Sequence, residues 1–339
     1  MPHARAAAHA HAQVRELVDG GVKPTAAELL EAGFSTGDMR AGGYEAGELK
    51  ASGIDLKEIR SGGYLASELR LSSFGAEELR AVGYSAREMH DGGFRATAMV
   101  HAGFDAAELK AGGYTLAEIR QVGNDSHVTV TKLREGGYSA RSFLLADYSP
   151  ADLIAADFTI EALRLAGCPA AALKEAGCNP YELRQAGFRI KNLKAVGYTP
   201  SEFREQGFLA DALRAAGFTI HELMGAGYSP DELRRAGFSA AEHKAAQFSV
   251  AALRDVGRFT ASQLDEVGYT VDELREGGYT AAEAITATYT EKQLREGGYT
   301  AAELKAVGMS AKELKQGGFT LAQLKQAGFA PWALNQAGF

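Results

Sequence analysis

The feature that most constrains the fold of this chain is a ten-residue period that runs through nearly all of its 339 residues. In order, each repeat has an aromatic residue, Ser or Thr, a small residue, a variable residue, Glu, Leu, Lys or Arg, a variable residue, Ala, Val or Gly, and Gly. Other apolar residues hold the aromatic position at Ile54, Cys168, Cys178 and Met309. There are about thirty repeats, and each is long enough for one short element of secondary structure.

The repeat carries start and stop signals for a helix. Ser or Thr followed three residues later by Glu, as in Thr300 and Glu303, is the pattern of a capping box. The aromatic residue before the cap and the Leu after it, here Tyr299 and Leu304, fit a hydrophobic staple. Lys or Arg in the last turn favours the negative end of the helix dipole, and Gly supplies the left-handed conformation that ends a helix. The pattern predicts one helix of about seven residues per repeat, each ended by Gly.

A β-helix of the pentapeptide type is the alternative, because Leu and the aromatic residue alternate every five residues. In such a coil, the position two residues before each Leu faces a narrow interior and must be small. In this chain that position includes Lys57, Glu77, Arg87, Tyr181, Lys191, His221, Lys292 and Trp332. Because these side chains are too large for a narrow interior, we favour the helical interpretation.

A helix of about seven residues is not stable alone, because nucleation costs more than its few hydrogen bonds return. Stacking in register would merge the aromatic and Leu columns into one continuous core. The sequence therefore predicts an all-α fold, a superhelical solenoid of about thirty short helices with one helix per ten-residue repeat. In general class this resembles the ankyrin, tetratricopeptide and HEAT-type solenoids, although their repeats have about 33 to 47 residues. The resemblance carries no functional residues across.

Departures from the period divide the chain into segments. We expect an N-terminal helical segment with a possible capping role at residues 1–23, repeats at 24–123, an irregular insertion at 124–137, and repeats continuing the same solenoid at 138–339. The insertion adds about four residues, places Asn124 in the aromatic column and contains the strand-like Val128, Thr129 and Val130. The expected structure of this insertion is a bulging loop.

Several residues stand out against the repeat as candidate sites. Asp125, Ser126 and His127 include the residue types of a hydrolytic triad, but consecutive residues cannot face one another in the required relay. His243 and Ala284 stand in the Leu column, where we expect local looseness, with His243 partly exposed or at a bend. The possible interaction or irregular sites are Asn124, Asp125, His127, Tyr181, His243, Ala284 and Trp332.

Metal and thiol chemistry are not expected. His9 and His11 are two residues apart on a helix and diverge, which favours a solvated helix over a metal site. Cys168 and Cys178 fit small buried thiols in adjacent core positions better than a disulfide. No cluster of titratable residues suggests a catalytic pocket, so we expect no enzymatic activity and no cofactor.

Charge and hydropathy limit the kinds of partner that we expect this chain to bind. The net charge is −7, with both signs spread evenly, which argues against a nucleic-acid-binding face. No apolar run has the length of a membrane span. The Ala-rich N-terminus has two arginines before its first acid, which leaves an organelle-transit segment as the alternative to a soluble intracellular protein.

Two functions follow from this pattern. The first is a structural or scaffolding protein, self-assembling end to end, because the array reaches Phe339 with no polar capping repeat. The alternative is a solenoid module that binds a protein or peptide. We favour the scaffold, because the variable positions mostly carry mixed Ala, Glu, Lys, Gln and Asp, with only Tyr181 and Trp332 resembling binding hot spots.

Overall fold

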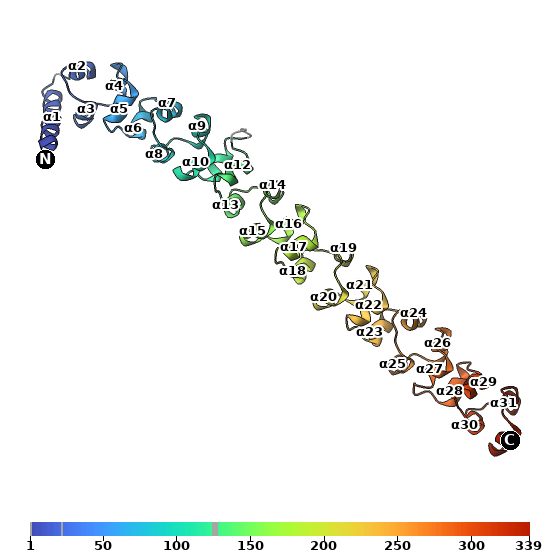
Figure 1. Cartoon of the computed structure of the whole chain (residues 1–339). Coiled ribbons are helices and arrows are strands. Elements are labelled where there is room, and N and C mark those ends of the chain that lie inside the picture. Colours follow the sequence, from blue (N-terminus) through green and yellow to red (C-terminus); the bar gives the residue numbers. More distant parts are fainter. Residues whose placement is uncertain (1, 22, 124–127) are drawn as a thin grey trace. The chain divides into compact units, whose positions relative to one another are not determined.

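The computed structural model describes residues 2–21, 23–123 and 128–339, with side chains from residue 9 onward. Over these residues the chain forms 32 α-helices and no β-strand, which confirms the all-α prediction of short helices about ten residues apart. The helices fall into two compact parts, an N-terminal part at Met1–Gly177 and a C-terminal part at Cys178–Phe339. Figure 1 labels the helices along the chain. The superhelical course and the segment boundaries stay predictions.

In the N-terminal part, one long helix precedes a series of short ones. They are α1 (Pro2–Asp19), α2 (Ala26–Glu31), α3 (Thr36–Ala41), α4 (Ala46–Ala51), α5 (Leu56–Ser61), α6 (Ala66–Leu71), α7 (Ala76–Ala81), α8 (Ala86–Asp91), α9 (Ala96–His101), α10 (Ala106–Gly112), α11 (Leu116–Arg120), α12 (Val130–Glu135), α13 (Ala140–Leu145), α14 (Pro150–Ala155), α15 (Ile160–Leu165) and α16 (Ala170–Glu175).

In the C-terminal part, all helices are short. They are α17 (Pro180–Gln185), α18 (Ile190–Ala195), α19 (Pro200–Glu205), α20 (Ala210–Ala215), α21 (Ile220–Gly225), α22 (Pro230–Arg235), α23 (Ala240–Ala245), α24 (Val250–Asp255), α25 (Ala261–Glu266), α26 (Val271–Glu276), α27 (Ala281–Ala284), α28 (Glu291–Glu296), α29 (Ala301–Ala306), α30 (Ala311–Gln316), α31 (Leu321–Gln326) and α32 (Pro331–Gln336).

The start of most short helices follows from the capping pattern, as α8 illustrates. The Glu88 N–H donates to Ser85 Oγ at 3.3 Å, while the Ser85 N–H donates to Glu88 Oε2 at 2.7 Å. Ser85 itself is extended, with φ −76° and ψ 158°, so the helix begins one residue later. Most helices therefore have six residues, one fewer than the sequence suggests.

The end of most short helices follows from a left-handed residue and the large apolar residue after it. After α7, Gly83 has φ +93°, its N–H donates to Arg80 O at 2.8 Å, and the Tyr84 N–H donates to Leu79 O at 3.0 Å. These bonds satisfy the last carbonyls of the helix. Five repeats reach the left-handed conformation without glycine, at Ser73, Asp147, Asp157, Gln247 and Arg258, so the prediction of a terminal Gly in every repeat is wrong there.

Within each part, helices pack against the next helix but one. In the N-terminal part α8 contacts both α6 and α10, and in the C-terminal part α26 contacts both α24 and α28. Figure 1 accordingly shows α7 and α9 along one edge and α8 and α10 along the other. The Leu-column side chains of both rows, such as Leu79 and Met89, are fully buried. The core of each part therefore lies between two rows of short helices.

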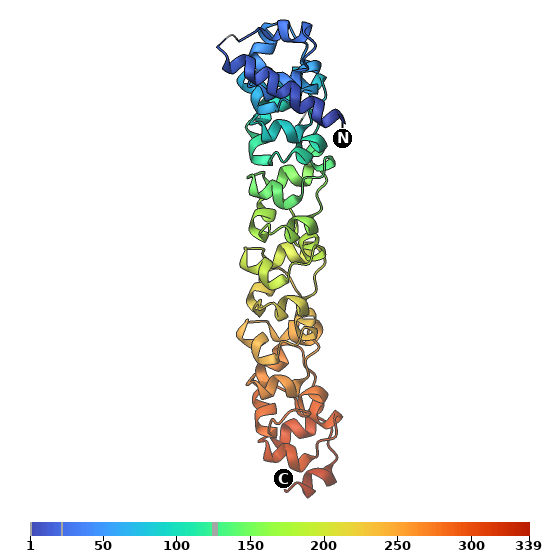
Figure 2. The same cartoon turned by 90° about the vertical axis from the view of Figure 1, so that its left-hand side faces the viewer.

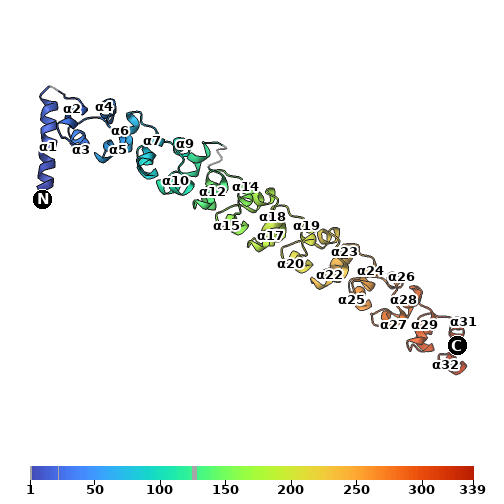
Figure 3. The same cartoon turned by 45° about the horizontal axis from the view of Figure 1, so that its top comes forward.

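The N-terminal helix α1 packs against α3 by a close approach. Val14 of α1 is fully buried, and a Cβ added at Gly42 would lie 2.4 Å from its Cγ1. His11 Nε2 lies 3.2 Å from Asp38 Oδ1, so this histidine has a protein partner rather than solvent alone. In Figures 2 and 3, α1 lies across the start of the short-helix series.

The stack keeps its register past the insertion. Thr129 caps α12, so Val128 holds the aromatic position and residues 128–130 are the start of a helix, not a strand. The Tyr138 O–H donates to Tyr114 O at 2.7 Å across 24 residues, where other repeats make the same bond across 20. Asn124, Asp125 and His127 themselves lie outside the described residues.

Candidate functional site

Tyrosines of the aromatic column join alternate repeats. The Tyr64 O–H donates to the Tyr44 carbonyl at 2.8 Å, and the Tyr84 O–H donates to the Tyr64 carbonyl at 2.5 Å. In the C-terminal part the Tyr299 O–H donates to the Tyr279 carbonyl at 2.7 Å. The same bond is made by Tyr44, Tyr114, Tyr198, Tyr228, Tyr279 and Tyr289. Each bond ties together the segments that follow two helices of the same row.

The basic residue of the repeat makes a second connection, which we call the basic clamp. Arg80 of α7 donates from Nη1 to Ala102 O at 2.7 Å, at the end of α9. Its guanidinium carbon lies 4.6 Å from the ring centroid of Phe104, within the range of a cation–π interaction. Its Nη2 lies 3.2 Å from Glu108 Oε2, in the capping box of α10. One side chain thus joins α7 to the end of α9 and the start of α10.

The clamp recurs in the C-terminal part. The Arg275 guanidinium carbon lies 4.7 Å from the Tyr299 ring centroid, and Arg275 Nη1 lies 3.2 Å from Glu303 Oε2. Lysine replaces arginine in some repeats, as where Lys194 Nζ lies 4.2 Å from the Phe218 ring centroid and donates to Gly217 O at 2.7 Å. Lys194 Nζ also lies 3.2 Å from Glu222 Oε2, so lysine, like arginine, reaches both a carbonyl and a carboxylate, but as a point charge.

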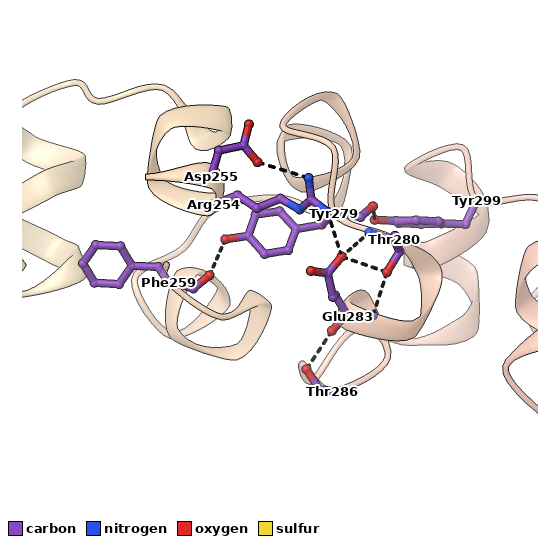
Figure 4. A network of polar contacts seen from close by, with 8 residues as sticks. All are labelled: Arg254, Asp255, Phe259, Tyr279, Thr280, Glu283, Thr286 and Tyr299. Carbon is purple, nitrogen blue, oxygen red and sulfur yellow. Dashed lines mark hydrogen bonds and ion pairs between the residues drawn. The ribbon is translucent and has the colours of Figure 1, made fainter. Parts of the chain in front are cut away.

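Figure 4 shows the clamp and the tyrosine bond together around Arg254. Arg254 Nη2 lies 3.6 Å from Glu283 Oε2, and its guanidinium carbon lies 5.7 Å from the Tyr279 ring centroid. The Tyr279 O–H donates to Phe259 O at 2.5 Å, and the Thr280 N–H donates to Glu283 Oε2 at 2.7 Å. The carboxylate of Glu283 is shared between its own helix cap and a basic residue of an earlier repeat.

These contacts move the pKa of several repeated groups further from neutrality. Hydrogen bonds from the Thr300 backbone and hydroxyl, together with the nearby Arg275, lower the pKa of Glu303. Burial raises the pKa of Tyr279 to about 12. General acid–base catalysis near neutrality requires a pKa close to the working pH. The repeated carboxylates and phenols therefore suit structure better than proton transfer.

The clamp also explains the exceptions in the aromatic column. A clamp residue stands 24 residues before its aromatic partner, or 28 where the insertion intervenes, as for Arg120 and Tyr148. The spacing is 25 where the extra residue near position 258 intervenes, as for Arg254 and Tyr279. Wherever the aromatic position holds another apolar residue, the clamp position in the sequence is aliphatic too. The paired positions are Leu30 and Ile54, Val100 and Val128, Leu144 and Cys168, Ile154 and Cys178, and Ile285 and Met309. An aliphatic residue gains nothing from an aromatic quadrupole, which accounts for these pairs. The reverse does not hold everywhere, because Met224 and Asp265 stand 24 residues before the aromatic Phe248 and Tyr289.

Sequence reasoning missed this clamp because it assigned Lys and Arg only to the dipole of their own helix. The available signal was the coincidence between aliphatic residues in the basic column and non-aromatic residues in the aromatic column, 24 positions on. That coincidence requires two columns to be compared across repeats, whereas the capping and stop signals are visible within one repeat.

His243 is fully buried, which corrects the expectation of partial exposure. Its Nδ1 lies 2.8 Å from Ser239 O and its Nε2 lies 3.2 Å from Pro230 O. Its ring centroid lies 5.4 Å from that of Phe248 and 4.9 Å from that of Phe259. Both nitrogens therefore face carbonyl oxygens within the core, and neither is directed toward a ligand site.

Ala284 marks a second irregularity, in the shortest helix of the C-terminal part. Ala284 is fully buried, and α27 has only four residues. Thr288 replaces the terminal glycine, and Asp265 replaces the clamp residue that would reach it. The Thr288 N–H donates to Asp265 Oδ2 at 3.0 Å, and its hydroxyl donates to the same oxygen at 2.5 Å. This pair reverses the usual polarity, with a carboxylate accepting from the helix end in place of a cation donating to it.

Tyr181 and Trp332 are exposed, as expected of the variable position. Tyr181 in α17 is 50% exposed and Trp332 in α32 is 71% exposed. The structure does not bring them together with His243 or Ala284, which are both buried. The candidate residues therefore do not form one site.

Three further features concern metal binding, the cysteines and membrane insertion. Among the described side chains, no group of three or more His, Cys, Asp and Glu residues is placed to hold a metal ion. Cys168 and Cys178 are buried thiols that are not joined in a disulfide, and burial raises the pKa of Cys168. In the described part of the chain, no helix combines the length and apolar character needed to cross a membrane.

The repeated tyrosine bonds and basic clamps define a class of protein, a helical tandem-repeat protein with one helix per repeat. A family model described as a decapeptide repeat region matches residues 11–79, 73–127, 127–200, 158–230, 197–271, 227–297 and 288–339. The chain belongs to this decapeptide repeat family. A comparison with curated proteins found no match.

Proposed function

We propose that this chain is a non-enzymatic structural or scaffolding protein. The observation that carries the proposal is the use of its polar side chains. The basic residue, the capping Glu and the tyrosine hydroxyl of successive repeats bind one another, as in the network of Arg254, Glu283 and Tyr279. A repeated set of bonds of this kind is suited to building a long, stiff array, because each repeat interacts mainly with its near neighbours.

The exposed surface supports a passive role. The position two residues before Leu is alanine in many repeats, among them Ala107, Ala151, Ala241 and Ala302. Interfaces with high affinity are enriched in Trp, Tyr and Arg at their centre, and such residues are rare at this position. We infer that the protein partner, if the scaffold acts through one, is a further copy of the chain meeting it end to end.

A concentration series on the purified full chain tests this proposal. Sedimentation velocity should show larger species as the concentration rises, and negative-stain electron microscopy should show end-to-end pairs or filaments in the same samples. A single monomeric species over the whole range would rule out self-assembly. It would then favour the alternative, a module that binds a different protein or peptide, for which the exposed Trp332 and Tyr181 are the relevant observation.

A further inference from the structure

Trp332 owes its exposure to its place in the repeat. It is the one tryptophan in the sequence, and it is 71% exposed. It stands two residues before Leu334, at a position that is also exposed at Lys57, Tyr181 and Lys292 elsewhere in the array. Its exposure therefore does not depend on how near it lies to the last residue. Other large apolar side chains, such as Leu71 and Leu145, are also exposed, but the Trp332 ring is the largest of them.

A hollow of about 630 Å³ lies beside Trp332. It is formed between the start of α30 and the helix α32, which contact each other. Phe329 and Trp332 give it apolar lining, while Ser310, Lys312 and Gln336 line it with polar groups. A hollow with aromatic lining and a few polar groups is the usual form of a site for a protruding side chain.

The surroundings of the hollow are positively charged, unlike the chain as a whole. The net charge of the chain is −7, yet residues 305–339 contain four lysines, Lys305, Lys312, Lys315 and Lys325, against one acidic side chain, Glu313. Lys305 also lines the hollow, donating from Nζ to Gly328 O at 2.6 Å. Lys312 is exposed, and within the described part of the chain it makes no ion pair. The Glu313 carboxylate accepts hydrogen bonds from the Ser310 N–H and hydroxyl in the cap of α30. An acidic group entering the hollow would therefore meet the Lys312 ammonium and an excess of positive charge.

We propose that Trp332, Phe329 and Lys312 form a docking surface for a linear peptide segment of a partner protein, one that carries acidic residues and a large apolar side chain. The apolar side chain enters the hollow against the two aromatic rings. A carboxylate of the peptide pairs with the Lys312 ammonium. This inference names the partner of the binding role given above as the alternative function, and it does not depend on self-assembly.

The single tryptophan makes the surface directly measurable. Random linear peptides displayed on phage are selected on the full chain, and enriched sequences are synthesised and titrated while Trp332 fluorescence is followed. Enriched peptides should combine Asp or Glu with Phe, Trp or Leu, and binding of those without tryptophan should shift the Trp332 emission to shorter wavelength. Lys312→Glu should weaken binding by about tenfold, because it places like charges opposite each other.

Matched variants separate this surface from general effects. Lys57→Glu makes the same charge change at the same repeat position in α5 and should leave the affinity unchanged. Trp332→Ala should abolish binding measured by calorimetry, whereas Tyr181→Ala, which removes the other exposed aromatic residue, should not. Circular dichroism checks that each variant keeps its helicity.

Three results would overturn the proposal. One is a selected peptide set without acidic residues, and another is equal binding to the chain and to Trp332→Ala. The third is a shift of Trp332 emission with chain concentration alone, which would make a second copy the occupant. Loss of self-assembly would leave the peptide titration unchanged, so failure of the scaffold proposal and failure of this one are distinguishable.

Discussion

At the residue scale, the clamp residue has more contacts than its own helix can explain. A basic residue at the end of a short helix gains a few tenths to about 1 kcal/mol from the helix dipole alone. Arg214 in α20 also donates to Ala236 O at 3.0 Å and lies 4.6 Å from the Phe238 ring centroid. Because these partners belong to a later repeat, the residue type is set by contacts between repeats as well as by its own helix.

The terminal glycines provide a matched pair to test this. A Cβ added at Gly237, with φ +90°, would lie 2.4 Å from Arg214 Nη1, whereas one at Gly217, with φ +89°, would meet nothing within 4 Å. Alanine at either position strains the left-handed backbone by about 1 kcal/mol. Gly237→Ala must also displace the clamp, which adds about 0.5–1 kcal/mol.

Native-state hydrogen exchange of the preceding helices measures both costs, in α22 for Gly237→Ala and in α20 for Gly217→Ala. We expect the larger loss of protection for Gly237→Ala. Equal losses would mean that the clamp contributes nothing at this site.

The capping carboxylates predict a weakening in acid. The pKa of Glu303 is lowered, first by the hydrogen bond from the Thr300 backbone. A lowered pKa in the folded state means that the stabilisation is complete above the unfolded value of about 4.3 and is lost as pH falls through the folded value. Protection of the α29 amides should therefore decrease as pH is lowered below about 5, after correction for intrinsic exchange. Glu303→Gln should reduce this dependence, because Gln263, Gln293 and Gln323 form the same capping box without a charge.

At the element scale, much of each helix could be predicted from its own repeat. The cap, the buried Leu and the left-handed last residue of α29 all follow from the sequence of residues 299–308. The short length of α27 and the first residue of α12 could not be predicted from their own repeats. The first depends on Asp265, which lies 23 residues before Thr288. The second depends on Val128 matching Val100, across an insertion that hides the period.

The paired exceptions predict coupling between elements. Ile285 and Met309 hold the clamp and aromatic positions that Arg275 and Tyr299 hold ten residues earlier. Ile285→Arg alone adds a charge without an aromatic partner, and Met309→Phe alone adds a ring without a cation. The double variant should be more stable than the sum of the single changes predicts, by about 0.5–1 kcal/mol, measured as a double-mutant cycle in urea. Strict additivity would show that the two positions do not interact.

At the scale of the whole molecule, each part is a sum of near-neighbour contacts. Stability in such arrays is approximately the sum of repeat and interface contributions, so a repeat can be removed if the register is kept. Deleting residues 208–217 removes one ten-residue repeat from the C-terminal part and brings equivalent positions into the same columns. We expect this variant to keep its helicity per residue and to melt within a few degrees of the parent.

The matched control deletes residues 208–212, which is half a repeat. It places Leu-column residues where aromatic residues belong and should lower both helicity and melting temperature. Similar melting of the two variants would indicate that the ten-residue register does not hold the array together. Circular dichroism with thermal melting provides both values.

The central claim is that each repeat is bonded to the next but one through its clamp residue, and a pair of double-mutant cycles tests it most directly. Arg275 lies 4.7 Å from the Tyr299 ring centroid, and the Tyr289 ring 14 residues away provides the control. Alanine variants are made singly and together, and the free energy of local opening is measured by hydrogen exchange. The account predicts a coupling of about 0.5–1 kcal/mol between Arg275 and Tyr299 and none between Arg275 and Tyr289. Equal coupling in both pairs, or none in the first, would contradict it.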